Sequence, residues 1–110
     1  MITAKFKCDL SSNILSLTIE GHAGQAEHGK DIVCASASIL TLSVAQMMME
    51  MHENGNLKKD PIITLEDGKS EIMAVCKDCF SYYNAKRIFD VAYTGFAILG
   101  ARYPEYVRLI

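Results

Sequence analysis

The chain has 110 residues, half of them hydrophobic, and a formal net charge of -2 at pH 7. This length suits a single domain over residues 1–110 with one core, and the weak negative charge gives no electrostatic case for binding nucleic acid. Four cysteines and no recognisable signal peptide favour a reducing compartment, so we expect a cytoplasmic protein.

The first segments predict a β-hairpin. Apolar and polar side chains alternate over residues 2–8 and again over residues 14–20, as in half-buried strands. Between them, residues 9–13 carry the Asp, Ser and Asn side chains that are common in turns. We therefore expect two neighbouring strands joined by a short turn.

A glycine-rich loop follows the second strand. Gly21, Gly24 and Gly29 interrupt regular structure, and His22 and His28 lie among them. A long loop inside a small domain is more often functional than not. We expect a mobile flap that is partly disordered or misplaced in the free protein and becomes ordered around a substrate.

Residues 32–53 predict the longest helix. The apolar residues at helical spacing are Val33, Ala37, Leu40, Val44, Met47, Met48 and Met51. Ile39 and Leu42 widen this stripe, so we expect the helix to be buried on several sides. Gln46, Glu50 and several serines interrupt the apolar run, which favours a core helix over a membrane span.

The second half of the chain repeats the order of hairpin and helix. Residues 62–66 and 69–76 flank an Asp67-Gly68 turn, and residues 106–110 predict a short last strand. Residues 80–101 predict a second helix, whose apolar side is Phe80, Ile88, Phe89, Ala92, Phe96 and Leu99. Gly95 is expected to loosen this helix. The whole predicts an α+β fold: a two-layer domain with a mostly antiparallel sheet of two hairpins plus a short C-terminal strand, and two long helices packed on one face.

The strongest candidate for chemistry is Asp31-x-x-Cys34 at the start of the first helix. If Asp31 caps the helix, Cys34 is the third helical residue and its side chain leans back toward the N-terminus. The positive end of the helix then favours thiolate over thiol, and a thiolate near a histidine is an activated nucleophile. An inert, buried cysteine remains the alternative.

The chain alone leaves open the roles of the residues that support Cys34. His22 directly follows a strand and can be held more rigidly than His28, which is the rival base. Ser38 lies one turn beyond Cys34, where its hydroxyl can donate to a substrate or to the sulfur, or bond back to the Cys34 carbonyl. Asp31 either caps the helix or orients His22.

Cys76-Lys77-Asp78-Cys79 is a rival motif, because Cys-x-x-Cys between a strand and a helix is typical of redox sites. The surrounding pattern is not βαβ, however, and the sequence has no second cysteine pair to complete a zinc site with Cys76 and Cys79. We expect neither a metal nor a cofactor, and we assign no role to Cys8.

The loop and the helix start also resemble a known family. Gly21-His22-Ala23, a glycine-bearing loop, and then Gly-x-Asp-Ile-Val-Cys-Ala-x-x-Ser over residues 29–38 are similar to the signature of the Prp-type ribosomal-processing cysteine proteases. The match is dense over residues 21–38 and weaker over residues 1–20 and 103–106. The roles of nucleophile and base in that family fall on Cys34 and His22, and its aspartate and serine fall on Asp31 and Ser38. Residues 25–28, which vary in that family, leave the peptide selectivity open.

The resemblance implies a cytoplasmic, homodimeric cysteine endopeptidase that removes the N-terminal extension of large-subunit ribosomal protein twenty-seven and so supports ribosome assembly. Cys34 would attack the peptide, His22 would protonate the leaving amine, and backbone N–H groups including that of Cys34 would stabilise the oxyanion. We expect no direct contact with nucleic acid or a membrane. Two alternatives are a non-catalytic ribosome-assembly binding module and a thiol-redox protein that uses Cys76 and Cys79.

Overall fold

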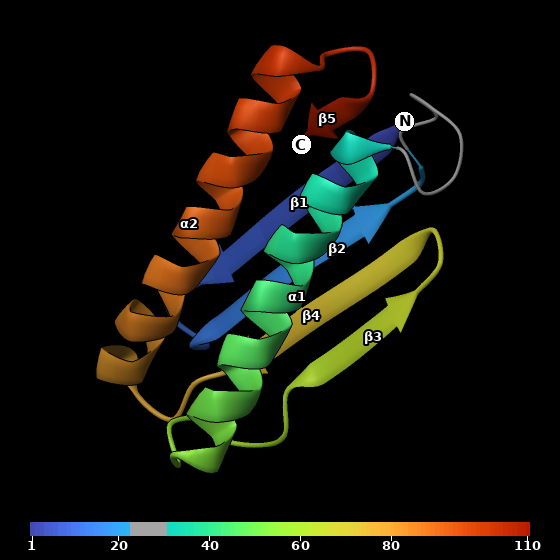
Figure 1. Cartoon of the computed structure of the whole chain (residues 1–110). Coiled ribbons are helices and arrows are strands. Elements are labelled where there is room, and N and C mark those ends of the chain that lie inside the picture. Colours follow the sequence, from blue (N-terminus) through green and yellow to red (C-terminus); the bar gives the residue numbers. More distant parts are fainter. Residues whose placement is uncertain (23–30) are drawn as a thin grey trace.

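The computed structural model describes residues 1–22 and 31–110, and in these residues five strands form one sheet. The strands are β1 (Ile2–Asp9), β2 (Ile14–Glu20), β3 (Ile62–Glu66), β4 (Lys69–Val75) and β5 (Val107–Leu109). Two long helices, α1 (Ile32–Glu53) and α2 (Cys79–Arg102), lie on one face of the sheet (Figure 1). The predicted two-layer α+β fold is confirmed, with strand and helix ends that differ from the predicted ones by a residue or two.

The order of the strands in the sheet is β3-β4-β2-β1-β5. The β1–β2, β2–β4 and β3–β4 pairs are antiparallel, whereas β5 runs parallel to β1, so the sheet is mixed. The pairing of β2 with β4 joins the two hairpins, and its register places Glu20 opposite Lys69. The chain therefore leaves β2 directly beside the turn between β3 and β4.

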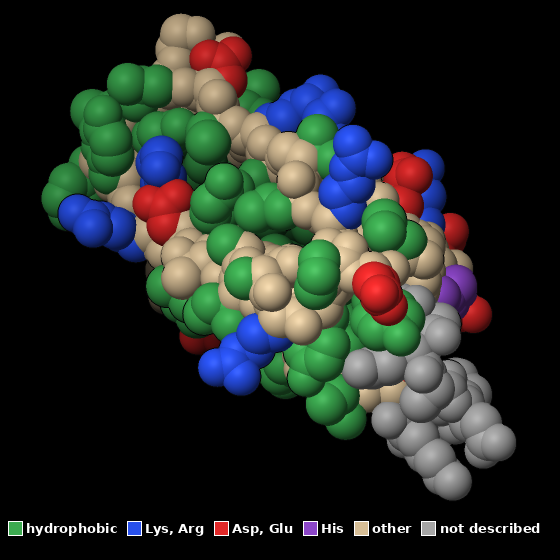
Figure 2. Space-filling model, turned by 90° about the horizontal axis from the view of Figure 1, so that it is seen from above, with side chains coloured by type: hydrophobic (Ala, Val, Ile, Leu, Met, Phe, Trp, Pro, Cys, Tyr) green, Lys and Arg blue, Asp and Glu red, His purple; other side chains and the backbone are tan. Residues whose placement is uncertain are grey.

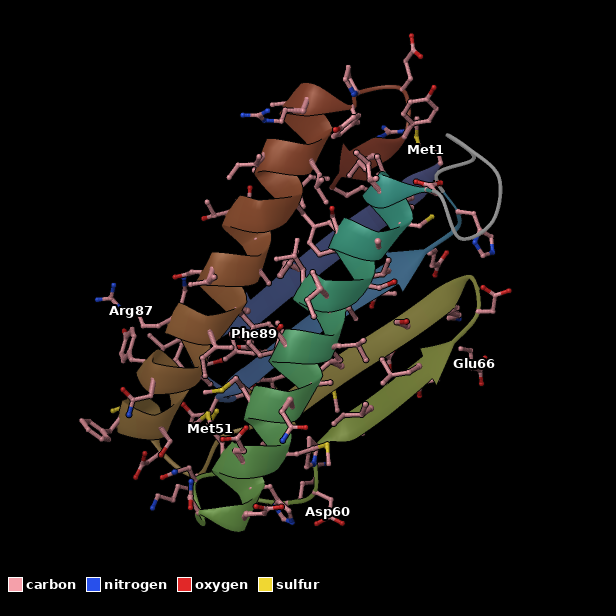
Figure 3. All side chains as sticks on the ribbon, viewed as in Figure 1. Met1, Met51, Asp60, Glu66, Arg87 and Phe89 are labelled. Atoms are coloured by element: carbon pink, nitrogen blue, oxygen red, sulfur yellow. The ribbon has the colours of Figure 1, made fainter. Side chains whose placement is uncertain are left out.

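The hydrophobic core lies between the sheet and the two helices. Its most deeply buried large side chains include Leu15, Leu17 and Ile72 from the sheet, Val33 and Met48 from α1, and Phe96 from α2. Phe89 lies between α2 and the sheet, whereas Arg87 points away from the core (Figure 3). Burial of one such large apolar side chain contributes about 1.5–3 kcal/mol relative to leaving it in water.

Four apolar side chains that we expected to be buried are exposed. Ile39, Leu42 and Met47 on α1 are 61%, 48% and 39% exposed, and Phe80 on α2 is 73% exposed. On α1 the prediction was wrong because the helix packs against the sheet and against α2 and leaves its outer side open. Phe80 lies in the first turn of α2, ahead of the buried Ser81 and Tyr82.

The two helices approach each other closely at Gly95. A Cβ atom added there would lie 2.7 Å from a Leu40 methyl carbon of α1, so the glycine makes room for the neighbouring helix. α2 continues without interruption through this position, and the expected loosening of the helix is wrong. The glycine serves the helix–helix contact instead.

By length and composition alone, α1 is apolar enough to cross a membrane. In this fold its buried residues supply part of the core; they are Val33, Ala37, Thr41, Val44, Ala45, Met48 and Met51. Packing against the sheet and α2 thus accounts for the buried side of α1, whereas apolar side chains such as Ile39 and Met49 lie exposed outside the core.

Candidate active site

The start of α1 is held by Asp31, which is the N-cap residue of the helix. Its carboxylate oxygen Oδ1 accepts hydrogen bonds from the backbone N–H groups of Val33 and Cys34, each at 3.0 Å. Cys34 is therefore the third residue of the helix, in the first turn, where the partial positive charge of the helix terminus stabilises an anionic sulfur. The structure shows Asp31 in the first of the two roles left open for it, the cap of the helix.

The same hydrogen bonds correct one detail of the expected chemistry. The N–H of Cys34 donates to Asp31 Oδ1, and the N–H of Ala35 donates to the Asp31 carbonyl at 3.1 Å. These amide groups already have acceptors, so the N–H of Cys34 is not available as an oxyanion donor in this arrangement. The donors for a reacting carbonyl oxygen must come from elsewhere around the pocket.

Cys34 is half-buried and lines a pocket of about 660 Å³. One wall is the first turns of α1, with Ser38, Thr41 and Leu42. The other wall is the end of the sheet, where the chain leaves β2 and where residues 65–70 turn from β3 into β4. Met1 and Glu66 lie toward this end of the molecule and Met51 and Asp60 toward the other (Figure 3).

His22 lies in the same pocket, directly after β2. The preceding Gly21 has a positive φ of 92°, and an added Cβ there would collide with the Met1 carbonyl oxygen, so only glycine fits. The imidazole is 60% exposed, and its Nε2 atom lies 3.7 Å from Oδ1 of Asp67. The structure thus brings His22 and Cys34 to one pocket from a strand end and a helix start.

Ser38 is exposed and also lines this pocket, one turn beyond Cys34. Ser36 on the same helix donates a hydrogen bond to the Ile32 carbonyl at 2.7 Å. Within residues 1–22 and 31–110 the Ser38 hydroxyl makes no such bond, so the alternative of a back-bond to the Cys34 carbonyl is not found there. The hydroxyl is a donor that a ligand in the pocket can use.

Some predicted site residues do not line the pocket, and others lie outside the residues that the structure describes. Gly24, Gly29 and the rival base His28 lie outside the described residues, so the flap stays a prediction. Cys76 follows β4 at the other end of the strand from the pocket and is 1% exposed, while Cys79 is exposed as the first residue of α2. Burial, and then the Asp78 carboxylate, raise the pKa of the Cys76 thiol, which disfavours a reactive thiolate there.

The sequence reasoning missed residues on the sheet side of the pocket. The sequence pattern predicts only a hairpin turn at Asp67 and Gly68, yet both residues lie beside His22. Apolar side chains are prominent on the face seen in Figure 2, and Leu42 and Leu65 supply exposed apolar surface at the pocket itself. The pairing of β2 with β4 creates this wall, and no local pattern in the chain reports that pairing.

Comparison with protein families gives one match, to the family described as cysteine protease Prp, over residues 1–108. A comparison with curated protein sequences finds no match.

Solved structures with the same fold are also found. An essential ribosomal processing protease Prp from S. aureus, in complex with a covalently linked product peptide, is 26% identical with a TM-score of 0.71; the match covers 99% of this chain and 97% of that one. A second structure of that protease, with a substrate peptide, is 24% identical with a TM-score of 0.63 over 100% and 98% of the two chains, and supports the fold alone. A Streptococcus mutans protein is 25% identical, with a TM-score of 0.65 over 99% and 91%.

Proposed function

Because the chain belongs to the cysteine protease Prp family, we propose that it is an endopeptidase whose nucleophile is Cys34 and whose base is His22. The observation that carries this assignment is the half-buried Cys34 in the capped first turn of α1, facing a pocket that His22 also lines. The protease domain is proposed to span residues 1–110.

In the proposed reaction, His22 takes the proton of the Cys34 thiol and the thiolate attacks the scissile carbonyl carbon. The imidazolium then returns the proton to the leaving amine, and water hydrolyses the acyl-enzyme. Asp31 holds the thiol in the first turn of α1 by capping the helix. The Ser38 hydroxyl is proposed as a donor to the carbonyl oxygen, since it lines the pocket one turn beyond Cys34.

The proposed substrate is the N-terminal extension of large-subunit ribosomal protein twenty-seven, removed in support of ribosome assembly. The similar S. aureus protein is described as a ribosomal processing protease with a product peptide bound, which supports a peptide substrate of this kind. The pocket offers apolar surface at Leu42 and Leu65 together with polar groups, as a peptide site does. The net charge of -2 supports action on a protein segment without direct contact to nucleic acid.

We further propose that the protein is cytoplasmic, is not bound to a membrane, and acts as a homodimer. Exposed large apolar side chains on α1 away from the pocket, namely Ile39, Met47 and Met49, supply surface that a second copy can cover. The molar mass in solution, measured by light scattering, tests the dimer. A mass near 12.2 kDa at micromolar concentration would contradict it.

Cleavage of the extension peptide tests the function. Wild-type protein should release the extension, and Cys34→Ala should lower kcat/KM by about 10⁴-fold or more, because the residue that forms the covalent intermediate is gone. Cys34→Ser tests the need for sulfur and should be similarly inactive. Circular dichroism should show both variants folded. Cleavage by Cys34→Ala near the wild-type rate would refute the assignment.

A further inference from the structure

The turn between β3 and β4 is attached to the backbone that carries His22. The β2–β4 register ends with Glu20 opposite Lys69, which places the next residues of both segments side by side. There the N–H of Gly21 donates a hydrogen bond to the Gly68 carbonyl at 2.8 Å. The position of His22 is therefore set by the hairpin turn as well as by β2.

The turn also contacts the imidazole itself through Asp67. Oδ1 of Asp67 lies 3.7 Å from Nε2 of His22, within ion-pair range but longer than a direct hydrogen bond. Contacts in a catalytic site are often long before substrate binds and shorten in the complex. The Asp67 side chain is 94% exposed, so solvent screens the interaction and its effect is modest.

Gly68 supplies the space that the ring occupies. A Cβ atom built on Gly68 would lie 3.0 Å from Nε2 of His22, and the backbone there has a φ of +78°. A side chain at this position would require the imidazole to shift by a few tenths of an ångström and would also strain the backbone. The turn therefore combines an attractive contact at Asp67 with an open position at Gly68.

We propose that the Asp67-Gly68 turn positions the imidazole of His22 for its work on Cys34. Asp67 attracts the Nε2 edge of the ring and Gly68 leaves room for it, which leaves the other ring nitrogen, Nδ1, as the one available to the thiol. Asp67 and Gly68 are positioning residues: they act through His22 and touch no reacting atom. The inference rests on the proposed function, in which His22 is the base.

Gly68→Ala gives the first test, with Gly55→Ala as its matched control. Both glycines have positive φ, +78° and +75°, so alanine strains the backbone similarly at each. A Cβ at Gly55 meets nothing within 4 Å, whereas a Cβ at Gly68 meets His22. Gly68→Ala should lower kcat by about 10- to 100-fold through displacement of the base. Gly55→Ala should stay within about twofold of wild type at an equal loss of stability.

Asp67→Asn gives the second test, with Glu71→Gln on the same hairpin as its control. Glu71 does not line the pocket, so its variant removes the same charge away from His22. Asp67→Asn should lower kcat about fivefold with KM unchanged, in keeping with an exposed ion pair. Alkylation of Cys34 by iodoacetamide should slow by the same factor, because this small reagent needs the base but not the peptide site. Asp67→Glu should recover part of the loss.

These experiments distinguish a failure of the positioning role from a failure of the protease assignment. If His22→Ala and Cys34→Ala abolish cleavage while Gly68→Ala matches Gly55→Ala, the positioning role is wrong and the protease assignment stands. A rise in KM for Asp67→Asn at constant kcat and constant alkylation rate would mean that Asp67 binds the peptide, and would also overturn the positioning role. If His22→Ala keeps wild-type activity, the proposed function itself fails.

Discussion

The two long helices begin in the same way but lead to different chemistry. Asp31 caps α1 through the N–H groups of Val33 and Cys34, and Asp78 caps α2 through the N–H of Ser81 at 2.8 Å. Each helix carries a cysteine in its first turn, Cys34 as the third residue of α1 and Cys79 as the first residue of α2.

The surroundings of the two helix N-termini differ. Cys34 faces a pocket of about 660 Å³ that His22 and the β3–β4 turn also line. Cys79 is exposed and lines neither of the pockets found in the described part of the chain, and Cys76, just before the second cap, is buried. A capped helix terminus is common in proteins; a base and a pocket facing it are what make a site for nucleophilic catalysis.

The largest expected effect concerns the base at the α1 pocket. His22→Ala should lower kcat/KM for the extension peptide by about 10²–10⁴-fold, the usual effect of losing a general base. His28→Ala is the paired variant and should lose far less, because the family resemblance assigns the role of base to His22, which lines the pocket with Cys34. A larger loss for His28→Ala in the same kinetic assay would exchange the two roles.

Thiol reactivity compares the two helix starts directly. At mildly acid pH, iodoacetamide should alkylate Cys34 about 10- to 100-fold faster than Cys79, because both cysteines have a helix terminus but only Cys34 shares its pocket with His22. Cys76 should react slowest, since burial raises the pKa of its thiol. Peptide mapping by mass spectrometry gives each rate. Faster labelling of Cys79 than of Cys34 would favour the redox alternative.

Removal of each cap separates stability from activity. Asp31→Ala should cost about 1 kcal/mol of unfolding free energy and should also lower activity, because the first turn that holds Cys34 frays. Asp78→Ala should destabilise α2 and leave the cleavage rate unchanged. Urea unfolding measured beside the kinetic assay distinguishes the two effects. Equal activity losses in the two variants would mean that the caps act only through global stability.

The Asp78 cap also predicts a dependence on pH. A hydrogen bond from the Ser81 backbone N–H lowers the pKa of the Asp78 carboxyl in the folded protein. The ionised cap therefore stabilises the fold above the ordinary carboxyl pKa, and this contribution is lost as the pH falls through the lowered value. As the pH falls below about 4, the Asp78→Asn variant should therefore lose less unfolding free energy than the wild-type protein. An unchanged acid-unfolding curve would contradict this contribution.

The smallest expected effect is that of the cysteines at the other end of the molecule. Cys76→Ser with Cys79→Ser should leave kcat/KM within about twofold of wild type, because neither thiol is near the pocket. The unfolding free energy of this variant should fall somewhat, because the substitution puts a hydroxyl at the buried Cys76 position. Abolished cleavage in a variant that still unfolds cooperatively would instead give this pair a catalytic role.

The sequence by itself determined the order of elements, the α+β class and the start of α1. Alternation of apolar residues, helical spacing and the Asp-Gly turn act over a few neighbouring residues, so they can be recognised without the fold. The cap at Asp31 and the place of Cys34 in the first turn follow from the same local rules, since an N-cap side chain reaches N–H groups two and three residues ahead. For the same reason the Prp-like motif was recognisable in the chain.

Only the tertiary structure decided what faces Cys34. The contact of His22 with Asp67 and Gly68 depends on the pairing of β2 with β4, whose partners are 49 to 61 residues apart in the chain. The open outer side of α1 likewise depends on where the sheet and α2 lie, because its apolar pattern alone resembled that of a helix buried on several sides. Contacts between distant segments are chosen by the packing of the whole core, and the local periodicity of each segment is compatible with several such arrangements.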